Sequence, residues 1–261
     1  MSGGWTVTAL RYASRPTTRA DVFLRYAEYR EPDGPQEMTY YLWVLRSGER
    51  TIVVDTGFSA AGGGRRGREF LVDPLEALHR VDVDPGGVEL LIVTHLHYDH
   101  TGHLDTFAHT PTVVSRSEVE FWTGPLAARA QFAAHIESDE VRGLAGRART
   151  GEVTLTEGEH EVTPGVLSIE VGGHSPGQTI LAIEGENGPI LLTSDAVHFY
   201  EEVDRDRACA VLHDLARVYG AYDTIREYVQ RGARLVVGHD PLVMDRFPRL
   251  ESDPELGVLV A

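Results

Sequence analysis

The sequence has very little cysteine: Cys209 is the only one among its 261 residues. A single thiol excludes an internal disulfide, and it excludes a structural zinc site built from several cysteines. The lack of disulfides fits a reducing compartment, so we expect a cytoplasmic protein. Cys209 stands between two alanines, and we expect it to be a small buried residue.

Long apolar runs are missing as well. No segment approaches the roughly 18 consecutive apolar residues that a membrane-spanning helix needs. The first residues also lack the basic region and apolar core of a secretory signal. We therefore expect neither a membrane partner nor secretion.

Basic residues are scarce relative to acidic ones. The chain has 24 lysines and arginines against 40 aspartates and glutamates, which gives a formal net charge of −16 at pH 7. A surface of this charge repels phosphate backbones, which argues against nucleic acid as a partner. Bound divalent metal ions would offset part of the negative charge.

What the sequence does contain is one dense group of metal-binding side chains. The segment 94–100 reads Thr-His-Leu-His-Tyr-Asp-His and directly follows an apolar run. In an extended chain, residues two apart point to the same side, so His95 and His97 share a face and Asp99 continues the alternation. His100 joins them only if the chain turns sharply. Two diverging sets of imidazole and carboxylate donors predict a metal site, most simply one with two ions held close together.

Three further donors stand where a predicted strand gives way to a loop. His174 comes shortly after an apolar strand, Asp195 ends another, and His239 follows a third. Because loops at one edge of a sheet converge, we expect these side chains to meet the first group. Glycines beside His174 and His239 would allow the backbone to approach closely.

Asp55 ends another predicted strand, within an Asp-Thr-Gly sequence. Its carboxylate could orient a ligand histidine through the ring nitrogen that does not bind metal. It could equally form an Asx turn with the residues that follow. Both interpretations stay open.

The rest of the sequence predicts one domain in which strands dominate both halves. Short apolar or β-branched segments between glycine, proline and aspartate are typical of strands, and apolar residues every three or four positions are typical of helices. The strands are predicted at 5–10, 22–26, 40–45, 51–55, 90–94, 112–115, 166–171, 179–183, 190–194 and 235–238. The helices are predicted at 74–81, 117–122, 126–145 and 210–231. This mixture indicates an α+β fold with two packed sheets and helices outside.

Two segments interrupt this pattern. Residues 60–68 are rich in glycine and arginine and predict a mobile loop. The Arg65–Arg68 part could attract an anionic or carbonyl-bearing substrate, or it could have no role. Residues 117–150 have the size of a helical insertion that could cover a substrate pocket, with a plain connector as the alternative.

In these motifs the chain resembles the metallo-β-lactamase superfamily, a group of hydrolases with an αββα sandwich fold. The matching elements are Asp55-Thr56-Gly57, His95-x-His97-x-Asp99-His100, Gly173-His174-Ser175-Pro176-Gly177, Asp195 and His239. The resemblance implies a single domain over residues 1–261 with two mixed sheets and helices outside.

The resemblance also implies a set of metal ligands. By this likeness one ion is held by His95, His97 and His174. The second ion is held by Asp99, His100 and His239, and Asp195 bridges the two. Zinc is the expected metal, with iron, cobalt and manganese as alternatives.

Within the superfamily the chain is most similar to the quorum-quenching N-acyl-homoserine lactonases. The implied reaction opens a small-molecule lactone by attack of a metal-bridging hydroxide, and Asp99 returns a proton to the leaving alkoxide. Those lactonases often carry a tyrosine three residues after the bridging aspartate, placed to bind the substrate carbonyl oxygen. Here that position is His198, and Tyr200 stands two residues further on, so both are candidates. Relatives of this kind make a homodimer plausible.

Other functions stay open at this point. The same metals could hydrolyse another ester, thioester or cyclic substrate, as in relatives that resemble glyoxalase II. A diiron redox protein normally needs a carboxylate among the first-site ligands and an attached flavin domain, and neither is visible in the sequence. A metal-bearing binding protein without turnover is disfavoured by the complete ligand set.

Overall fold

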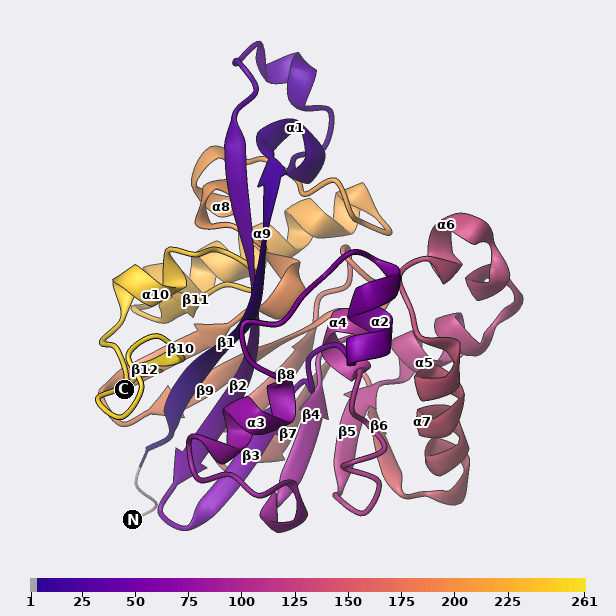
Figure 1. The fold of residues 1–261 in the computed structure, drawn as a ribbon, viewed down its shortest axis with the longest axis vertical. Helices are drawn as coiled ribbons and strands as arrows, with labels where there is room; N and C mark the ends of the chain where they lie inside the picture. The colour runs from indigo at the N-terminus through magenta and orange to yellow at the C-terminus, as the bar shows by residue number, and fades with distance from the viewer. Residues whose placement is uncertain (1–3) are drawn as a thin grey trace.

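The computed structural model describes residues 4–261, which form two β-sheets packed against each other (Figure 1). The strands of the larger sheet are β1 (Thr6–Thr18), β2 (Pro35–Ser47), β3 (Arg50–Val54), β4 (Leu90–Val93), β5 (Thr112–Ser115), β6 (Val153–Thr156) and β12 (Gly257–Val260). Those of the smaller sheet are β7 (Glu159–Thr163), β8 (Val166–Glu170), β9 (Thr179–Gly185), β10 (Gly188–Leu192) and β11 (Arg234–Val236). The strand orders are β12-β1-β2-β3-β4-β5-β6 and β11-β10-β9-β8-β7.

Both sheets are mixed. In the larger sheet β12, β1, β2 and β3 pair antiparallel, whereas β3, β4, β5 and β6 pair parallel. In the smaller sheet β10 and β11 pair parallel and the other neighbours pair antiparallel. The predicted fold class, two packed mixed sheets with helices outside, is confirmed.

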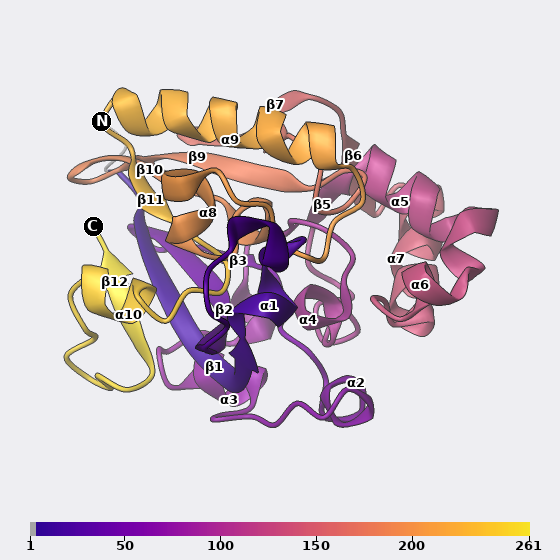
Figure 2. The ribbon, with the colours of Figure 1, turned by 90° about the horizontal axis from the view of Figure 1, so that it is seen from above.

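Helices cover the outer faces of both sheets. Figure 2 shows α9 (Leu215–Gln230) outside the smaller sheet and α3 (Pro74–His79) on the opposite side of the molecule. The other α-helices are α1 (Arg19–Val22), α2 (Ala60–Arg65), α4 (Tyr98–Thr101), α5 (Arg116–Thr123), α6 (Ala130–Ala133), α7 (Ser138–Thr150), α8 (Tyr200–Arg205) and α10 (Val243–Arg246). Short 3₁₀ turns are η1 (Tyr26–Tyr29), η2 (Pro85–Gly87), η3 (Pro125–Ala128) and η4 (Ser194–Ala196). Within residues 4–261, none of the helices combines the length and apolar character needed to cross a bilayer.

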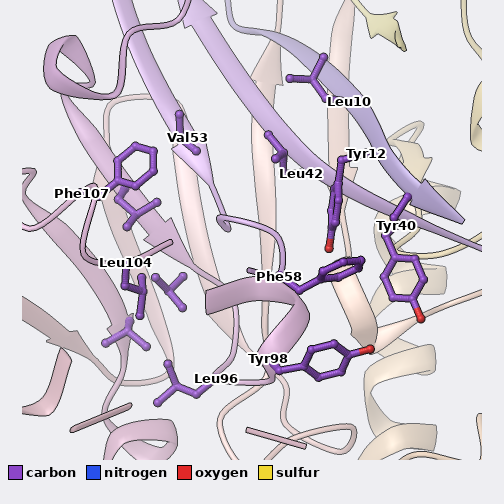
Figure 3. Packing of buried hydrophobic residues seen from close by; sticks show 14 of the residues in the cluster. Leu10, Tyr12, Tyr40, Leu42, Val53, Phe58, Leu96, Tyr98, Leu104 and Phe107 are labelled. Atoms are coloured by element: carbon purple, nitrogen blue, oxygen red, sulfur yellow. The ribbon is translucent and has the colours of Figure 1, made fainter. Parts of the chain in front are cut away.

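The larger sheet has an apolar core on each of its faces. Along β2, Trp43 points toward the smaller sheet and packs with residues such as Leu192, because alternate side chains of a strand lie on opposite faces. Leu42 points the other way, into the core under the outer helices. Figure 3 shows this second core, in which Phe58 lies among the rings of Tyr12, Tyr40 and Tyr98.

Several sequence predictions for single elements are wrong. The strand predicted at 22–26 is replaced by α1 and η1, and Arg25 between them has a left-handed φ of 51°. The glycine-rich segment 60–68 is not a loop throughout: α2 forms there, with the Ser59 hydroxyl accepting a hydrogen bond from the Gly62 amide. The helix predicted at 126–145 is broken into η3, α6 and α7.

One helix start also moved, and three strands were missed. The long helix predicted at 210–231 begins only at Leu215, because Asp214 caps it by accepting from two backbone amides. The missed strands are β6, β7 and β12. β7 is mostly exposed and contains one aliphatic residue, so it lacks the apolar alternation that marks a strand.

Candidate metal centre

The seven predicted donors all lie at strand ends on one side of the two sheets. β4 ends at Val93, and the loop and helix α4 that follow carry His95, His97, Asp99 and His100. The other three donors come from the smaller sheet. They are His174 after β8, Asp195 in η4 after β10, and His239 after β11.

These donors form two adjoining groups. Donor atoms of His95, His97 and His174 all lie within 4.8 Å of one another. The same holds for the second group, which consists of Asp99, His100, Asp195 and His239. All seven side chains are buried. The structure therefore brings together every residue that the sequence suggested as a metal ligand.

Asp195 lies between the two groups. Its Oδ2 is 3.5 Å from Nε2 of His174 and 3.0 Å from Nε2 of His239. Its Oδ1 is 3.3 Å from Nε2 of His100. One carboxylate thus faces donors of both groups.

A close backbone approach makes this position possible. A Cβ atom on Gly238 would lie 2.7 Å from Oδ1 of Asp195 and 2.6 Å from the Ser194 carbonyl oxygen. Only glycine leaves room there. The glycine that precedes His239 in the sequence therefore lets that histidine come beside Asp195.

Backbone and side-chain acceptors fix the outer nitrogen of the histidine rings. Nδ1 of His174 lies 2.9 Å from the Val211 carbonyl, and Nδ1 of His239 lies 2.8 Å from the Thr39 carbonyl. Each ring must donate from Nδ1 to such an acceptor, so its Nε2 carries the free lone pair. This arrangement is typical of metal-binding histidines.

Unpartnered buried nitrogen atoms show that the donors fit a metal ion. Nε2 of His95 is buried and has no hydrogen-bond partner among residues 4–261. Nε2 of His100 forms no hydrogen bond of normal geometry either. Five imidazoles and two carboxylates without a thiolate suit zinc, iron, manganese or cobalt. The donor set therefore fits divalent transition-metal ions.

The charges in the first group also suit metal binding. Burial, reinforced by the neighbouring imidazoles, lowers the pKa of His95, His97 and His174 well below the usual value for histidine. These rings are therefore neutral near pH 7. The neutral imidazole is the form that coordinates a metal.

The second group is more strongly charged. Burial disfavours protonation of His100, but the carboxylates of Asp195 and Asp55 outweigh burial and raise its pKa well above the usual value. Burial likewise disfavours the Asp195 carboxylate, yet His239 and His100 outweigh it and hold the Asp195 pKa well below the usual range. Asp195 is therefore negatively charged near neutral pH.

Asp55 supports the centre from behind. It is fully buried, it has a left-handed φ of 60°, and its Oδ2 lies 2.7 Å from Nδ1 of His100. Oδ1 accepts from the Thr94 amide at 2.8 Å, and Oδ2 accepts from the Thr94 hydroxyl at 2.8 Å. Of the two open interpretations, these contacts favour the orientation of a histidine.

We expect Asp55→Asn to weaken metal binding about 10–100-fold. Both Asp55 oxygens accept hydrogen bonds, so one of them would become an NH₂ group that faces a donor. Metal content after dialysis against a graded chelator would measure the effect. Asp73→Asn is the matched control, because Asp73 only caps α3 and asparagine caps equally well. Equal metal retention in the two variants would contradict this role of Asp55.

Sequence reasoning missed Glu118, which ties two donor loops together. This residue of α5 is fully buried, and its Oε2 accepts from the Leu96 amide at 2.9 Å and from the Trp122 indole at 2.7 Å. Its Oε1 accepts from the Gly177 amide at 2.7 Å. The only signal in the sequence is a glutamate on the apolar face of a helix, beside Val119 and Trp122.

Two cavities adjoin the donors. The donor cavity has a volume of about 240 Å³ and contains Asp99, Asp195 and His239 in its wall. The aromatic cavity has a volume of about 430 Å³ and is lined by Trp122, Phe132 and other residues. His97, His135, His174 and Val211 line both cavities.

Cations also face the donor cavity. Arg66 and Arg68, from the glycine-rich segment, lie in its wall, whereas Arg65 pairs with Glu137 outside it. Arg15 of β1 also lies in the wall, and its buried Nε has no hydrogen-bond partner among residues 4–261. Sequence reasoning missed Arg15, because nothing in a strand sequence shows which cavity the strand borders.

The two candidate oxyanion residues behave differently. His198 lies in the wall of the donor cavity, with its Nε2 3.4 Å from Oδ2 of Asp195. Tyr200 does not lie there: its hydroxyl donates to the Leu235 carbonyl at 3.0 Å, and Arg246 covers its ring. The prediction of a catalytic role for Tyr200 is therefore wrong. Helix α8 begins at this residue and directs its side chain away from the donor cavity.

Comparisons with known proteins agree with this architecture. The family model described as "Metallo-beta-lactamase superfamily" matches residues 37–249. An N-acyl homoserine lactonase from a Bacillus species is 29% identical over 220 residues, which cover 78% of this chain and 82% of that protein. A structure of an N-acyl homoserine lactone hydrolase with N-hexanoyl-L-homoserine at its catalytic metal centre matches with a TM-score of 0.77, at 23% identity, over 97% of this chain and 99% of that one. A dizinc quorum-quenching lactonase matches with a TM-score of 0.69, at 15% identity, over 92% and 89% of the two chains.

Proposed function

The chain belongs to the metallo-beta-lactamase superfamily, and from this membership we propose that it is a lactone hydrolase that works with two divalent metal ions. The observation that carries the proposal is the buried cluster of seven donors in two adjoining groups beside a cavity. The named activity of the similar lactonases supports N-acyl homoserine lactones as the substrate class.

We assign the ligands as the geometry groups them. His95, His97 and His174 would hold one ion, and Asp99, His100 and His239 would hold the other, with Asp195 shared. Zinc is the preferred metal, which the dizinc lactonase of similar fold supports. When bound, such ions lower the pKa of water, so that hydroxide is available near neutral pH, and they polarise a carbonyl group as Lewis acids.

His198 would stabilise the negative charge that develops on the carbonyl oxygen. Burial disfavours its protonation, but Cys209, Glu202 and Asp195 outweigh burial and raise its pKa well above the usual value. The imidazole is therefore a charged donor in the wall of the donor cavity. Asp99 lies in the same wall and would return a proton to the alkoxide that leaves when the ring opens.

The adjoining cavity suits an acyl chain. Trp122 and Phe132 supply aromatic surface there, and both belong to the helical segment 117–150. We propose that this segment covers the acyl part of the substrate. Arg15 in the wall of the donor cavity supplies a cation whose Nε has no hydrogen-bond partner among residues 4–261, and it could bind an amide carbonyl or the carboxylate that ring opening produces.

We expect His198→Phe to lower turnover about 100–1,000-fold while both metals stay bound, because it removes one oxyanion donor. Steady-state hydrolysis of a lactone, together with metal analysis of the same sample, would measure both effects. Tyr200→Phe is the matched control, since it removes a hydroxyl that donates to the Leu235 carbonyl and lies outside the donor cavity. An unchanged rate in His198→Phe would rule out the oxyanion role.

A substrate screen by acid release tests the function itself. Purified protein with measured metal content would be offered N-acyl homoserine lactones, simple lactones, aryl esters and thioesters. We expect the highest kcat/KM with acyl homoserine lactones. The arginines in the donor cavity favour one other candidate, an anionic thioester, and a preference for that class would replace the lactonase assignment.

A further inference from the structure

A second cluster of metal-binding side chains lies beside the seven donors. It consists of His198, Glu202 and Cys209, which are all buried and whose donor atoms lie within 4.8 Å of one another. His198 stands between the two clusters. Its Nε2 is 3.4 Å from Oδ2 of Asp195, and its Nδ1 is 3.4 Å from Oε1 of Glu202. The two ring nitrogens thus serve different neighbours.

The nitrogen that faces the second cluster has no hydrogen bond. Nδ1 of His198 has no hydrogen-bond partner among residues 4–261, and the side chain is 96% buried, so water does not readily supply one. Leaving a buried polar atom unsatisfied is costly. Cys209 is a free thiol, so it is not tied up in a disulfide. An unpartnered nitrogen and a free thiol beside one carboxylate indicate a place for a ligand.

Glu202 and Cys209 are held firmly in position. Oε1 of Glu202 accepts from the His198 and Phe199 amides, and Oε2 accepts from the Tyr222 hydroxyl at 2.8 Å. A carboxylate has about four lone-pair positions, so one remains for a cation. Cys209 is fixed by a β-bridge to Phe23 and by the backbone hydrogen bonds on either side of that bridge.

We propose that His198, Glu202 and Cys209 form a third cation site, which takes a thiophilic divalent ion such as Zn²⁺ and blocks the donor cavity when filled. Imidazole, carboxylate and thiolate together are a ligand set for zinc, and three protein ligands leave a fourth position open. His198 and Cys209 both lie in the wall of the donor cavity, so that position faces the space where substrate would bind. Filling the site displaces the protons of Nδ1 and of the thiol.

The site has a consequence for the enzyme. Metal beyond the amount that fills the seven-donor centre is inhibitory, because it occupies substrate space and takes up His198. The seven-donor centre contains no sulfur, whereas the third site contains the only cysteine of the chain. Absorption that arises from a thiolate bound to a metal therefore reports on the third site alone.

The test uses Co²⁺ as the probe on the metal-loaded enzyme. We expect added Co²⁺ to produce a thiolate-to-cobalt charge-transfer band in the near ultraviolet that saturates at one equivalent, with a parallel loss of hydrolysis. Cys209→Ala should lack the band, and its rate, whatever its starting value, should not fall when Co²⁺ or Zn²⁺ is added in excess. Glu202→Gln should keep the cysteine but need a higher cobalt concentration for the same band.

Three results would overturn the site. One is the absence of a thiolate band in the unaltered protein, and another is a band with the same midpoint in Glu202→Gln, which would mean that the thiol binds metal without the triad. The third is inhibition that persists in Cys209→Ala. If Glu202→Gln does not fold, protection of the Cys209 thiol from a thiol reagent by Zn²⁺ decides in its place, because full reactivity with Zn²⁺ present excludes binding.

Discussion

Replacing His97 with alanine is expected to abolish metal binding and lactone hydrolysis together. His97 is buried, belongs to the first donor group, and has its Nδ1 2.9 Å from Nε2 of His174. Loss of an outer contact to a metal ligand costs about 10–100-fold in affinity, so loss of a ligand should cost more. Metal content after gel filtration and kcat/KM measured on the same preparation would show both effects.

The control for this variant is His109→Ala, because His109 is an exposed histidine a short distance along the chain. It should keep its metal and its rate. Thermal unfolding of both variants with a chelator present separates a folding defect from a binding defect. Hydrolysis that survives in His97→Ala, or in unaltered protein after the metals are stripped, would contradict the proposed function.

Replacing Glu118 with alanine is expected to destabilise the protein by more than about 2 kcal/mol, because two buried amides would lose their acceptor and each such loss costs about 1–3 kcal/mol. The two amides are those of Leu96 and Gly177. The Trp122 indole would lose one of its two acceptors and keep the Ser175 hydroxyl. Leu96 lies between His95 and His97, so the first donor group should also loosen. Denaturant unfolding and metal content would measure the two effects.

Glu120→Ala provides a matched control, since Glu120 is exposed on the same helix. A surface substitution of this kind should change stability by less than about 0.5 kcal/mol. Equal unfolding midpoints in the two variants would show that Glu118 does not hold the donor loops.

The family, the fold class and the placement of the donors could be predicted because each has a local signal. Strand ends are visible in a sequence as apolar runs that stop, and His95, His174 and His239 follow such ends. β8, β10 and β11 run in the same direction, so the segments that follow them lie at one edge of the smaller sheet. The predictions of family and fold are confirmed, whereas the assignment of each metal ligand stays a prediction.

Other features could not be predicted because they depend on packing between distant segments. In the sequence, Glu118 looks like an ordinary helix residue. Only the structure shows that the Leu96 and Gly177 amides donate to it. In the same way, the sequence does not distinguish Arg15 from the other arginines. Only the structure shows that β1 borders the donor cavity. Tyr200 was misplaced because a side chain changes direction where a helix begins, and the sequence did not show that α8 begins there.

The donors are divided between the two layers of the sandwich. The segment after β4 belongs to the larger sheet, whereas His174, Asp195 and His239 belong to the smaller one. Bound ions would therefore connect the two layers. Metal binding would raise the free energy of unfolding in proportion to the logarithm of the free metal concentration. A shift of one sheet relative to the other by a single residue would separate the two sets of donors, while most apolar contacts between the sheets could still form. Activity should therefore depend more strictly than stability on the alignment of the two sheets.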